Sequence, residues 1–243
     1  MENLYGKNRT ELRTLCEELS LPRFAAAQIA RWLYTKHVTD PAAMTDLSAA
    51  ARARLAERCG TGLSAPVGVS ASSDGTKKYL FRTSQGHFIE SAYIPDGDRA
   101  TLCVSSQAGC RMGCRFCATG RQGLQQSLTT AQILNQIVSL PERDKLTNIV
   151  FMGMGEPLDN TGEVLRALEI LTAEWGFGWS PTRITLSTAG VVPELRRFLD
   201  ATKVHLAVSL HNPFHEERME IMPVERAWPI AEVAAILREY DFT

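Results

Sequence analysis

The sequence lacks the features that would place it in a membrane or direct it out of the cell. No apolar run approaches the roughly 20 residues that a membrane-spanning helix requires. The N-terminus, MENLYGKNRT, has neither the basic start nor the apolar stretch of a secretory signal. These absences favour a soluble cytoplasmic protein with no membrane partner.

The chain also lacks an excess of positive charge. Its 26 Lys and Arg residues are balanced by 27 Asp and Glu residues, for a net charge of −1. This balance excludes a uniformly basic nucleic-acid-binding protein, although a local group of Lys and Arg side chains can still contact phosphates.

Cysteine is scarce and unevenly placed. The sequence has six cysteines, of which four fall between positions 103 and 117, and none follows Cys117. In a reducing compartment such clustering indicates metal or catalytic ligands sooner than disulfides. Cys16 and Cys59 lie apart, in or beside helical segments, and are interpreted as structural.

Two main units with a connector are predicted from the 243 residues. Residues 1–62 are rich in Ala and Leu with helical periodicity, which is typical of a small helical domain. Residues 63–100 contain two strand-like runs, separated by a polar turn at 84–86, that predict a β-hairpin connector.

From residue 101 to 243 strands alternate with helices, a pattern that predicts an α/β fold with a parallel sheet. Helices are expected near 129–140, 160–174, 191–200 and 229–240. Only four strand–helix units are visible, so we expect an open, incomplete (β/α) barrel rather than a closed one.

The segment CRMGCRFC places Cys110, Cys114 and Cys117 on the loop after the first strand of the α/β region. Three thiolates can hold three irons of a [4Fe-4S] cluster, and the fourth iron stays open to chelate the amino and carboxylate groups of S-adenosylmethionine. Zinc or free thiols are the alternatives, but structural zinc requires four ligands and no suitably spaced fourth Cys or His follows nearby.

Four further segments indicate which family of cluster-binding proteins the sequence resembles. TLCVSSQAGC, FMGMGEP, TLSTAGVVP and VSLHNP together resemble the RlmN/Cfr family of radical S-adenosylmethionine RNA adenine methyltransferases. The resemblance covers essentially the whole chain, because the helical N-terminal region and the hairpin also match the family's layout. It implies a radical S-adenosylmethionine partial barrel with an RNA-binding type of N-terminal domain. It further implies ribosomal RNA and tRNA as substrates and a reductant such as flavodoxin or ferredoxin.

Several strand-end residues acquire a role through this resemblance. Alone, the GMGEP segment could be a plain turn, and the other positions could be ordinary strand ends. The segment is not a dinucleotide-binding fingerprint, because Leu158 stands where the third glycine would fall. The residues that the resemblance assigns to S-adenosylmethionine are Gly155, Glu156, Ser187, Ser209, Leu210 and His211.

Glu90 and Cys103, which precede the cysteine loop in the sequence, are candidates for acid–base chemistry. A lone strand cysteine such as Cys103 usually packs in a core. The resemblance implies that Cys103 deprotonates carbon 2 of adenine and then resolves a covalent protein–RNA intermediate by forming a disulfide. Glu90 matches a family glutamate assigned to proton transfer, and a polar strand face is its alternative.

RNA contact is the least specific prediction. Carbon 2 of adenine points inward in a duplex, so the target base must be unpaired or extruded. Basic side chains could contact the strand near the cysteine loop or from the N-terminal region, although solvated surface residues are the commoner explanation. These candidates are Arg111, Arg115, Arg121, Arg9, Arg13, Arg23, Arg31 and Lys36.

The family's reaction uses a 5′-deoxyadenosyl radical and a methylcysteine to methylate carbon 2 of adenine. Members continue with further strands and a second catalytic cysteine, so we expect this chain to be C-terminally truncated and of uncertain activity. Carbon 8 methylation of the Cfr type, a radical enzyme of another substrate class and a non-catalytic RNA-binding remnant are the alternatives.

Overall fold

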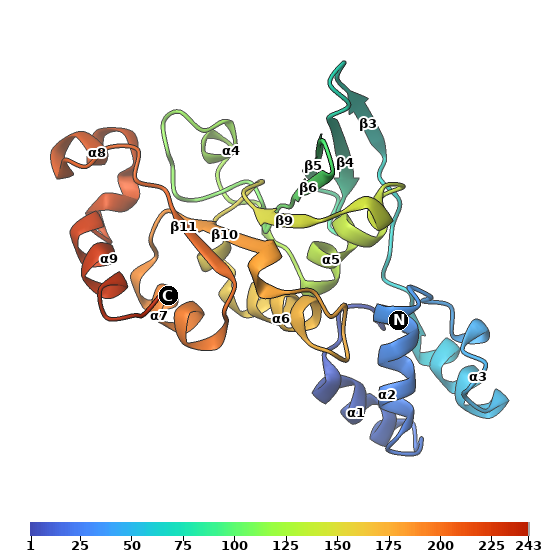
Figure 1. Cartoon of the computed structure of the whole chain (residues 1–243). Coiled ribbons are helices and arrows are strands. Elements are labelled where there is room, and N and C mark those ends of the chain that lie inside the picture. The colour runs from blue at the N-terminus through green and yellow to red at the C-terminus, as the bar shows by residue number, and fades with distance from the viewer. Residues whose placement is uncertain (243) are drawn as a thin grey trace.

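The computed structural model describes residues 1–242, and its N-terminal part is a group of short helices (Figure 1). Asn8 and Glu11 form a capping box that begins α1, and Ser48 caps α3. A short parallel pair of strands joins the two ends of this region, a feature that the sequence did not indicate. The elements are α1 (Arg9–Glu18), α2 (Ala25–Ala30) with a π-helical turn (Arg31–Thr35), a 3-10 turn (Pro41–Ala43), α3 (Ala49–Arg58), β1 (Glu2–Asn3) and β2 (Cys59–Gly60).

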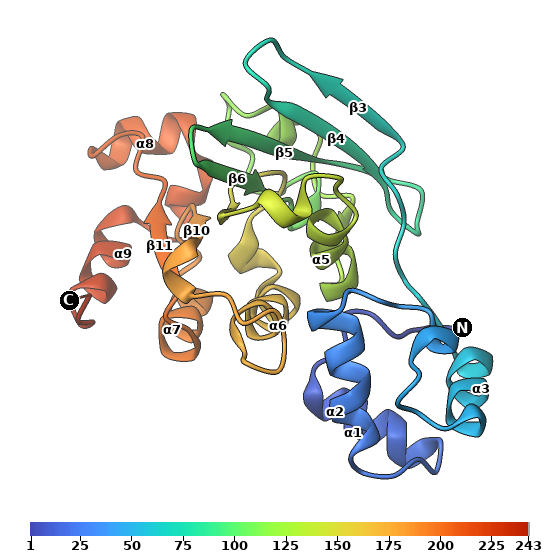
Figure 2. The ribbon, with the colours of Figure 1, turned by 45° about the vertical axis from the view of Figure 1, so that its right-hand side comes forward.

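One seven-stranded mixed sheet, in the order β11-β10-β9-β6-β5-β4-β3, organises the rest of the chain. The four strands from β6 to β11 are parallel, whereas β5, β4 and β3 are antiparallel. The bounds are β3 (Gly68–Ala71), β4 (Lys77–Arg82), β5 (Phe88–Asp96), β6 (Arg99–Cys103), β9 (Asn148–Phe151), β10 (Ile184–Thr188) and β11 (His205–Val208). The sheet confirms the α/β class and is open, as expected of a partial barrel (Figure 2).

The predicted hairpin forms as part of a larger antiparallel unit. β4 and β5 do pair around a turn at residues 83–87, but β3 adds a third strand and β5 pairs directly with β6. The sequence did not indicate β3, because three of its four residues are exposed and give no alternating pattern. The antiparallel strands therefore extend the main sheet.

Helices cover one face of this sheet. Leu102, Ile149 and Ile184 are paired across β6, β9 and β10 and are fully buried. Cys103, Val150 and Thr185 form the next paired row, point to the opposite face and stay partly exposed. We call this second face the open face. The covering helices include α5 (Thr130–Val138), α6 (Thr161–Thr172) and α7 (Val192–Ala201).

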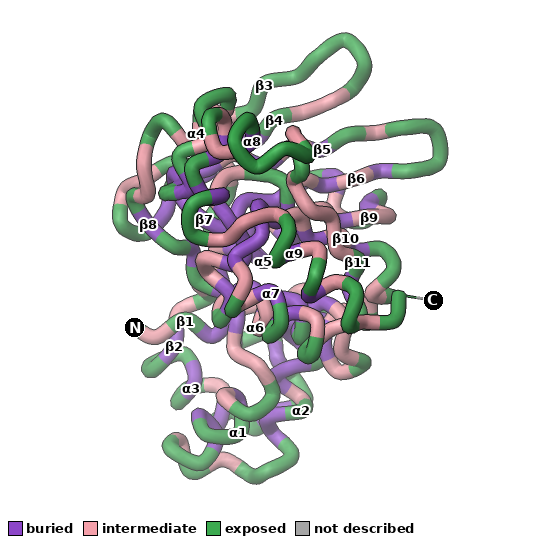
Figure 3. Tube along the Cα trace, turned by 90° about the vertical axis from the view of Figure 1, so that its left-hand side faces the viewer, coloured by how far each residue is buried: buried purple, intermediate pink, exposed green. Residues whose placement is uncertain are grey.

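The remaining elements are short and lie in the connections between the strands or after β11 (Figure 3). They are β7 (Gln107–Ala108), α4 (Ala118–Arg121), β8 (Gln126–Ser127), α8 (His215–Ile221) and α9 (Ile230–Leu237), with 3-10 turns at Arg143–Lys145, Pro157–Asp159, Pro181–Arg183 and Pro223–Arg226. Among residues 1–242, no helix is long and apolar enough to cross a membrane.

An aromatic cluster fixes the N-terminal helices to the α/β region. The ring of Tyr34 lies 5.3 Å from Tyr5, 6.0 Å from Trp175 and 5.9 Å from Phe177, measured between ring centroids. Gly6 adopts a φ of +89°, and a Cβ there would lie 2.7 Å from the backbone nitrogen of Ala131 in α5. The chain therefore passes close against α5 at a position where only glycine fits.

Candidate functional site

The candidate residues gather at one edge of the sheet. Cys103 ends β6, the GMGEP segment follows β9, Ser187 lies near the end of β10, and residues 209–211 follow β11. Because these strands are parallel, their carboxyl ends meet at the same edge, where α/β folds build their sites. The structure thus brings together residues that are up to 108 positions apart in the chain.

Glu90, Cys103 and Ser187 lie on the open face of the sheet. Ala92 of β5 pairs with Cys103 of β6, and Glu90 lies two residues before Ala92, so its side chain points to the same face. The Glu90 carboxylate lies 3.0 Å from Lys78 Nζ, and both side chains are about half exposed. Burial raises the pKa of the Cys103 thiol, although a hydrogen bond from the backbone at Met152 opposes the shift.

The three loop cysteines lie near one another. Cys117 N donates to Cys114 O at 3.1 Å, and Gly120 N approaches Cys117 Sγ at 3.4 Å. Burial raises the pKa of Cys110 to about 11, and the neighbouring charges of Cys114 and Cys117 contribute to that rise. Thiols held together in this way favour a positively charged metal group that stabilises the thiolates.

No group of three or more His, Cys, Asp and Glu side chains in the described part of the chain is arranged to hold a single metal ion. A cubane cluster takes one thiolate on each of several irons, so its cysteines need not converge on one point. The three thiols of this loop, each half-buried or more, provide the donor set that such a cluster requires.

A ring contact joins the cysteine loop to the segment after β11. The rings of Phe116 and His211 lie 4.6 Å apart, and both residues are exposed. His211 has a φ of +55°, a left-handed conformation that is uncommon for residues other than glycine. The loop that carries the cysteines therefore lies against the segment expected to contact S-adenosylmethionine.

Glu156 is buried, with 4% of its surface exposed. Its carboxylate accepts hydrogen bonds from Thr188 Oγ1 at 2.6 Å, Ala189 N at 2.8 Å and Leu158 N at 3.0 Å. Burial raises the pKa of this carboxyl, and the three hydrogen bonds oppose the shift. The side chain thus ties the loop after β9 to the end of β10, and Glu156 N donates to Gln107 Oε1 at 2.9 Å.

The glycines of this loop permit a close backbone approach. A Cβ on Gly153 would lie 2.7 Å from Val104 O and 2.8 Å from Ser105 Oγ. Gly155 has a φ of +100°, and a Cβ there would lie 2.6 Å from the side chain of Gln107. The loops after β6 and β9 therefore pack directly against each other.

Arg218 was not identified from the sequence. Its fully buried guanidinium donates to Ala189 O, Ser209 O and Leu210 O, each at 3.0 Å, and pairs with Glu225. The surrounding segment, FHEERME, has the composition of a solvent-exposed charged helix, so the sequence gave no indication that this arginine is buried. Arg218 fixes the loops after β10 and β11 relative to each other.

The arginines around the cysteine loop are partly engaged within the chain. Arg111 Nε lies 2.7 Å from Asp159 Oδ2, and Arg121 Nη2 donates to Arg115 O at 3.0 Å. All three arginines are exposed, and their contact with phosphates stays a prediction. Cys16 and Cys59 are buried in the N-terminal region.

Comparison with known proteins gives two family matches. Residues 104–243 match the model of the radical SAM superfamily. Residues 2–60 match the model of the ribosomal RNA large subunit methyltransferase N-terminal domain.

Individual relatives cover the chain almost completely. A Bacteroides fragilis protein described as a probable dual-specificity RNA methyltransferase RlmN is 57% identical over 240 residues, which are 99% of this chain and 70% of that protein. A Halorhodospira halophila dual-specificity RNA methyltransferase RlmN is 44% identical over 98% of this chain and 67% of its own length. The crystal structure of a radical SAM methyltransferase from Sphaerobacter thermophilus matches with a TM-score of 0.90 and 40% identity, over 99% of this chain and 72% of that one.

Proposed function

Because the chain belongs to the RlmN family of radical SAM RNA methyltransferases, we propose that it acts on carbon 2 of an adenine in large-subunit ribosomal RNA and in some tRNAs, in the cytoplasm. The observation that carries this proposal is the placement of Glu90 and Cys103 on the open face, next to the edge where the cysteine loop lies. The family uses a [4Fe-4S] cluster and S-adenosylmethionine, and the donors present fit both.

In this proposal Cys110, Cys114 and Cys117 hold the cluster. The loop at Gly155 and Glu156, together with Ser187 and residues 209–211, binds S-adenosylmethionine. When bound, these cofactors supply the one-electron chemistry that carbon 2 requires, because this carbon resists polar methyl transfer. A reductant such as flavodoxin or ferredoxin provides the electron. The contact between Phe116 and His211 supports a single composite site.

Cys103 and Glu90 handle protons at the RNA base. A thiol whose pKa is raised by burial gives a stronger base once deprotonated, as abstraction of the carbon 2 proton requires. Glu90, held in place by Lys78, lies on the same face and serves as the proton-transfer partner. Cys103 then resolves the protein–RNA adduct: its thiolate attacks the sulfur of the methyl-carrying cysteine to form a disulfide, the bond from that sulfur to the transferred carbon breaks, and its electron pair stays with the RNA base, which takes up a proton.

RNA recognition is shared among three units. We propose a helical RNA-binding domain at residues 1–62, an antiparallel connector at 63–100 and the radical SAM partial barrel at 101–243. The target adenine must leave its stack to reach the open face. The exposed arginines around the cysteine loop would contact the phosphates on either side of the target adenine.

Methyl transfer by this route needs a second cysteine. The chain spans about 70% of the length of the Bacteroides fragilis relative, and none of residues 118–243 is a cysteine. The 243-residue polypeptide, reconstituted anaerobically, is therefore expected to form 5′-deoxyadenosine slowly but no methyladenosine.

A chimera provides the positive test. Appending the C-terminal part of the Bacteroides fragilis relative should allow 2-methyladenosine to form in unmodified RNA, as read by mass spectrometry. In that chimera Cys103→Ala should abolish methylation, and Cys59→Ala should not. Formation of 8-methyladenosine would favour the Cfr-type alternative. Absence of any methylated adenosine, despite formation of 5′-deoxyadenosine, would contradict the proposed substrate.

A further inference from the structure

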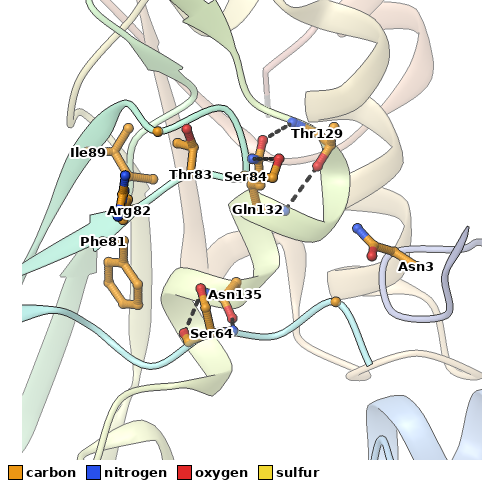
Figure 4. A pocket seen from close by; sticks show the side chains of 12 residues that line it. Asn3, Ser64, Phe81, Arg82, Thr83, Ser84, Ile89, Thr129, Gln132 and Asn135 are labelled. Carbon is orange, nitrogen blue, oxygen red and sulfur yellow. Dashed lines mark hydrogen bonds between the residues drawn. The ribbon is translucent and has the colours of Figure 1, made fainter. Parts of the chain in front are cut away.

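A polar pocket of about 480 Å³ lies between the β4–β5 turn, the first half of α5 and the segment that leaves the N-terminal helices (Figure 4). We propose that this pocket binds one unpaired nucleotide of the RNA substrate, separate from the target adenine; the inference rests on the proposed function. The lining residues are Asn3, Gly62, Ser64, Phe81, Arg82, Thr83, Ser84, Gly86, Ile89, Thr129, Gln132 and Asn135.

The pocket lies at the same edge of the sheet as the candidate site. β5 runs antiparallel to β6, and Ala92 pairs with Cys103 at the carboxyl end of β6. The earlier part of β5 and the turn at 83–87 therefore extend beyond that end. Residues after β6 and β8 lead into α5, whose N-cap, Thr129, lines the pocket. An RNA strand on the open face could thus continue around the hairpin tip into this pocket.

Charge and donor chemistry match a ribose-phosphate. Arg82 is the one charged side chain in the lining, which contains no Asp or Glu. Within residues 1–242 the side chains of Arg82 and Asn3 make no hydrogen bond or ion pair, and both residues are exposed. Guanidinium, amide and hydroxyl groups are the usual partners of phosphate and sugar oxygens. The volume lies in the range of pockets that hold a nucleotide-sized ligand.

The other polar residues are already fixed in place. Asn135 exchanges hydrogen bonds with the Ser64 backbone at 2.9 Å and 3.0 Å. Gln132 donates to Ser84 Oγ at 3.3 Å and also completes the capping box with Thr129. These bonds hold three segments that are distant in sequence around one cavity. The pocket is preformed. Arg82, which ends β4 on the open face beside Gly86, and Asn3 are left to meet the ligand at the rim of the pocket.

Phe81 and Ile89 border the pocket but are 2% exposed, so neither offers a base a face to stack on. The contacts available to a nucleotide are therefore those of its ribose and phosphate, made by guanidinium, amide and hydroxyl groups.

The test measures binding of an unmodified, fluorescent RNA stem–loop with adenine in its loop by anisotropy, with wild-type and variant proteins. Arg82→Ala should weaken binding about five- to tenfold and lower the salt dependence of log Kd by about 0.7, the value for one phosphate contact on a single strand. Asn3→Ala should weaken binding less, with an unchanged salt slope.

Arg99→Ala is the matched control, because Arg99 is an exposed arginine at the opposite end of β6. It should leave RNA affinity unchanged, and S-adenosylmethionine affinity should be the same in all variants. If the wild type binds RNA but Arg82→Ala has wild-type affinity and salt slope, the pocket assignment alone is wrong. An equal loss in Arg99→Ala would also overturn it, since diffuse charge would then explain the effect. A wild type that binds no RNA would contradict both the pocket and the proposed function.

Discussion

Arg218 and Glu225 form an ion pair in which both side chains are fully buried. The Arg218 guanidinium also satisfies three backbone carbonyls from the loops after β10 and β11. Although burial alone would raise it, the pKa of Glu225 is lowered by hydrogen bonds from His215, the Ile230 backbone and Arg218. The pair therefore acts as a joint between two loops of the candidate site.

Replacement of Arg218 by Met should be strongly destabilising. It leaves the buried Glu225 carboxylate without its cation and takes one donor from each of three carbonyl oxygens, a loss on the order of 3–5 kcal/mol in the free energy of unfolding. Urea denaturation of the apoprotein measures it. The control is Arg196→Ala, which breaks a surface pair with Glu239 whose side chains are about half exposed, and it should change stability little. Equal effects of the two variants would show that Arg218 is not the joint.

Glu156→Gln should alter how stability depends on pH. Burial raises the pKa of Glu156 in the folded protein, so the folded state holds its proton to higher pH than the unfolded state does. The contribution of Glu156 to the free energy of unfolding is most favourable below the pKa that this carboxyl has in the unfolded state. It declines as pH rises through the pKa of Glu156 in the folded state. The wild type should therefore lose stability relative to Glu156→Gln as pH rises above the ordinary carboxyl range. A difference that stays constant across that range would refute the assigned shift.

Gly153→Ala should distort the contact between the loops after β6 and β9. The added Cβ would lie 2.7 Å from a backbone oxygen, so the loop must move. We expect lower stability and weaker S-adenosylmethionine binding by calorimetry. Gly162→Ala is the control, because nothing lies within 4 Å of its Cβ in α6, and it should be neutral or stabilise by up to about 1 kcal/mol. Wild-type affinity in Gly153→Ala would show that this loop does not contribute to the site.

Cys114→Ala should abolish the brown [4Fe-4S] absorbance of anaerobically purified protein. Only two loop thiolates would remain, too few to retain a cluster with one open iron. The matched variant Cys59→Ala removes a buried cysteine from the N-terminal region and should keep its iron. Iron and sulfide analysis provides the measurement, and a zinc-loaded, iron-free wild type would overturn the assignment.

The sequence predicted the parallel half of the fold better than its edges. Helices such as Thr161–Thr172 carry a clear periodic pattern and were expected, and the alternation of strands with helices was expected as well. β1, β2 and β3 were missed, because strands of two to four residues are too short to show a period. Tertiary pairing alone defines them.

The parts of the candidate site that belong to recognisable sequence motifs could be predicted. The cysteine loop and the strand-end residues could be named from the sequence, and their common edge follows from parallel strands. The inward orientation of the Glu156 carboxylate could not be foreseen, since its partners Thr188 and Ala189 lie on another strand end. The same holds for Arg218, whose acceptors are backbone atoms and leave no trace in the residue pattern.

The aromatic cluster around Tyr34 sets an order for folding during synthesis. The N-terminal helices leave the ribosome first, but Trp175 and Phe177, which cover Tyr34, are made more than a hundred residues later. At roughly 5–20 residues per second, the aromatic face of the first helices stays exposed for on the order of ten seconds. The aromatic face of the nascent N-terminal region thus stays uncovered until the chain beyond α6 emerges and closes over it.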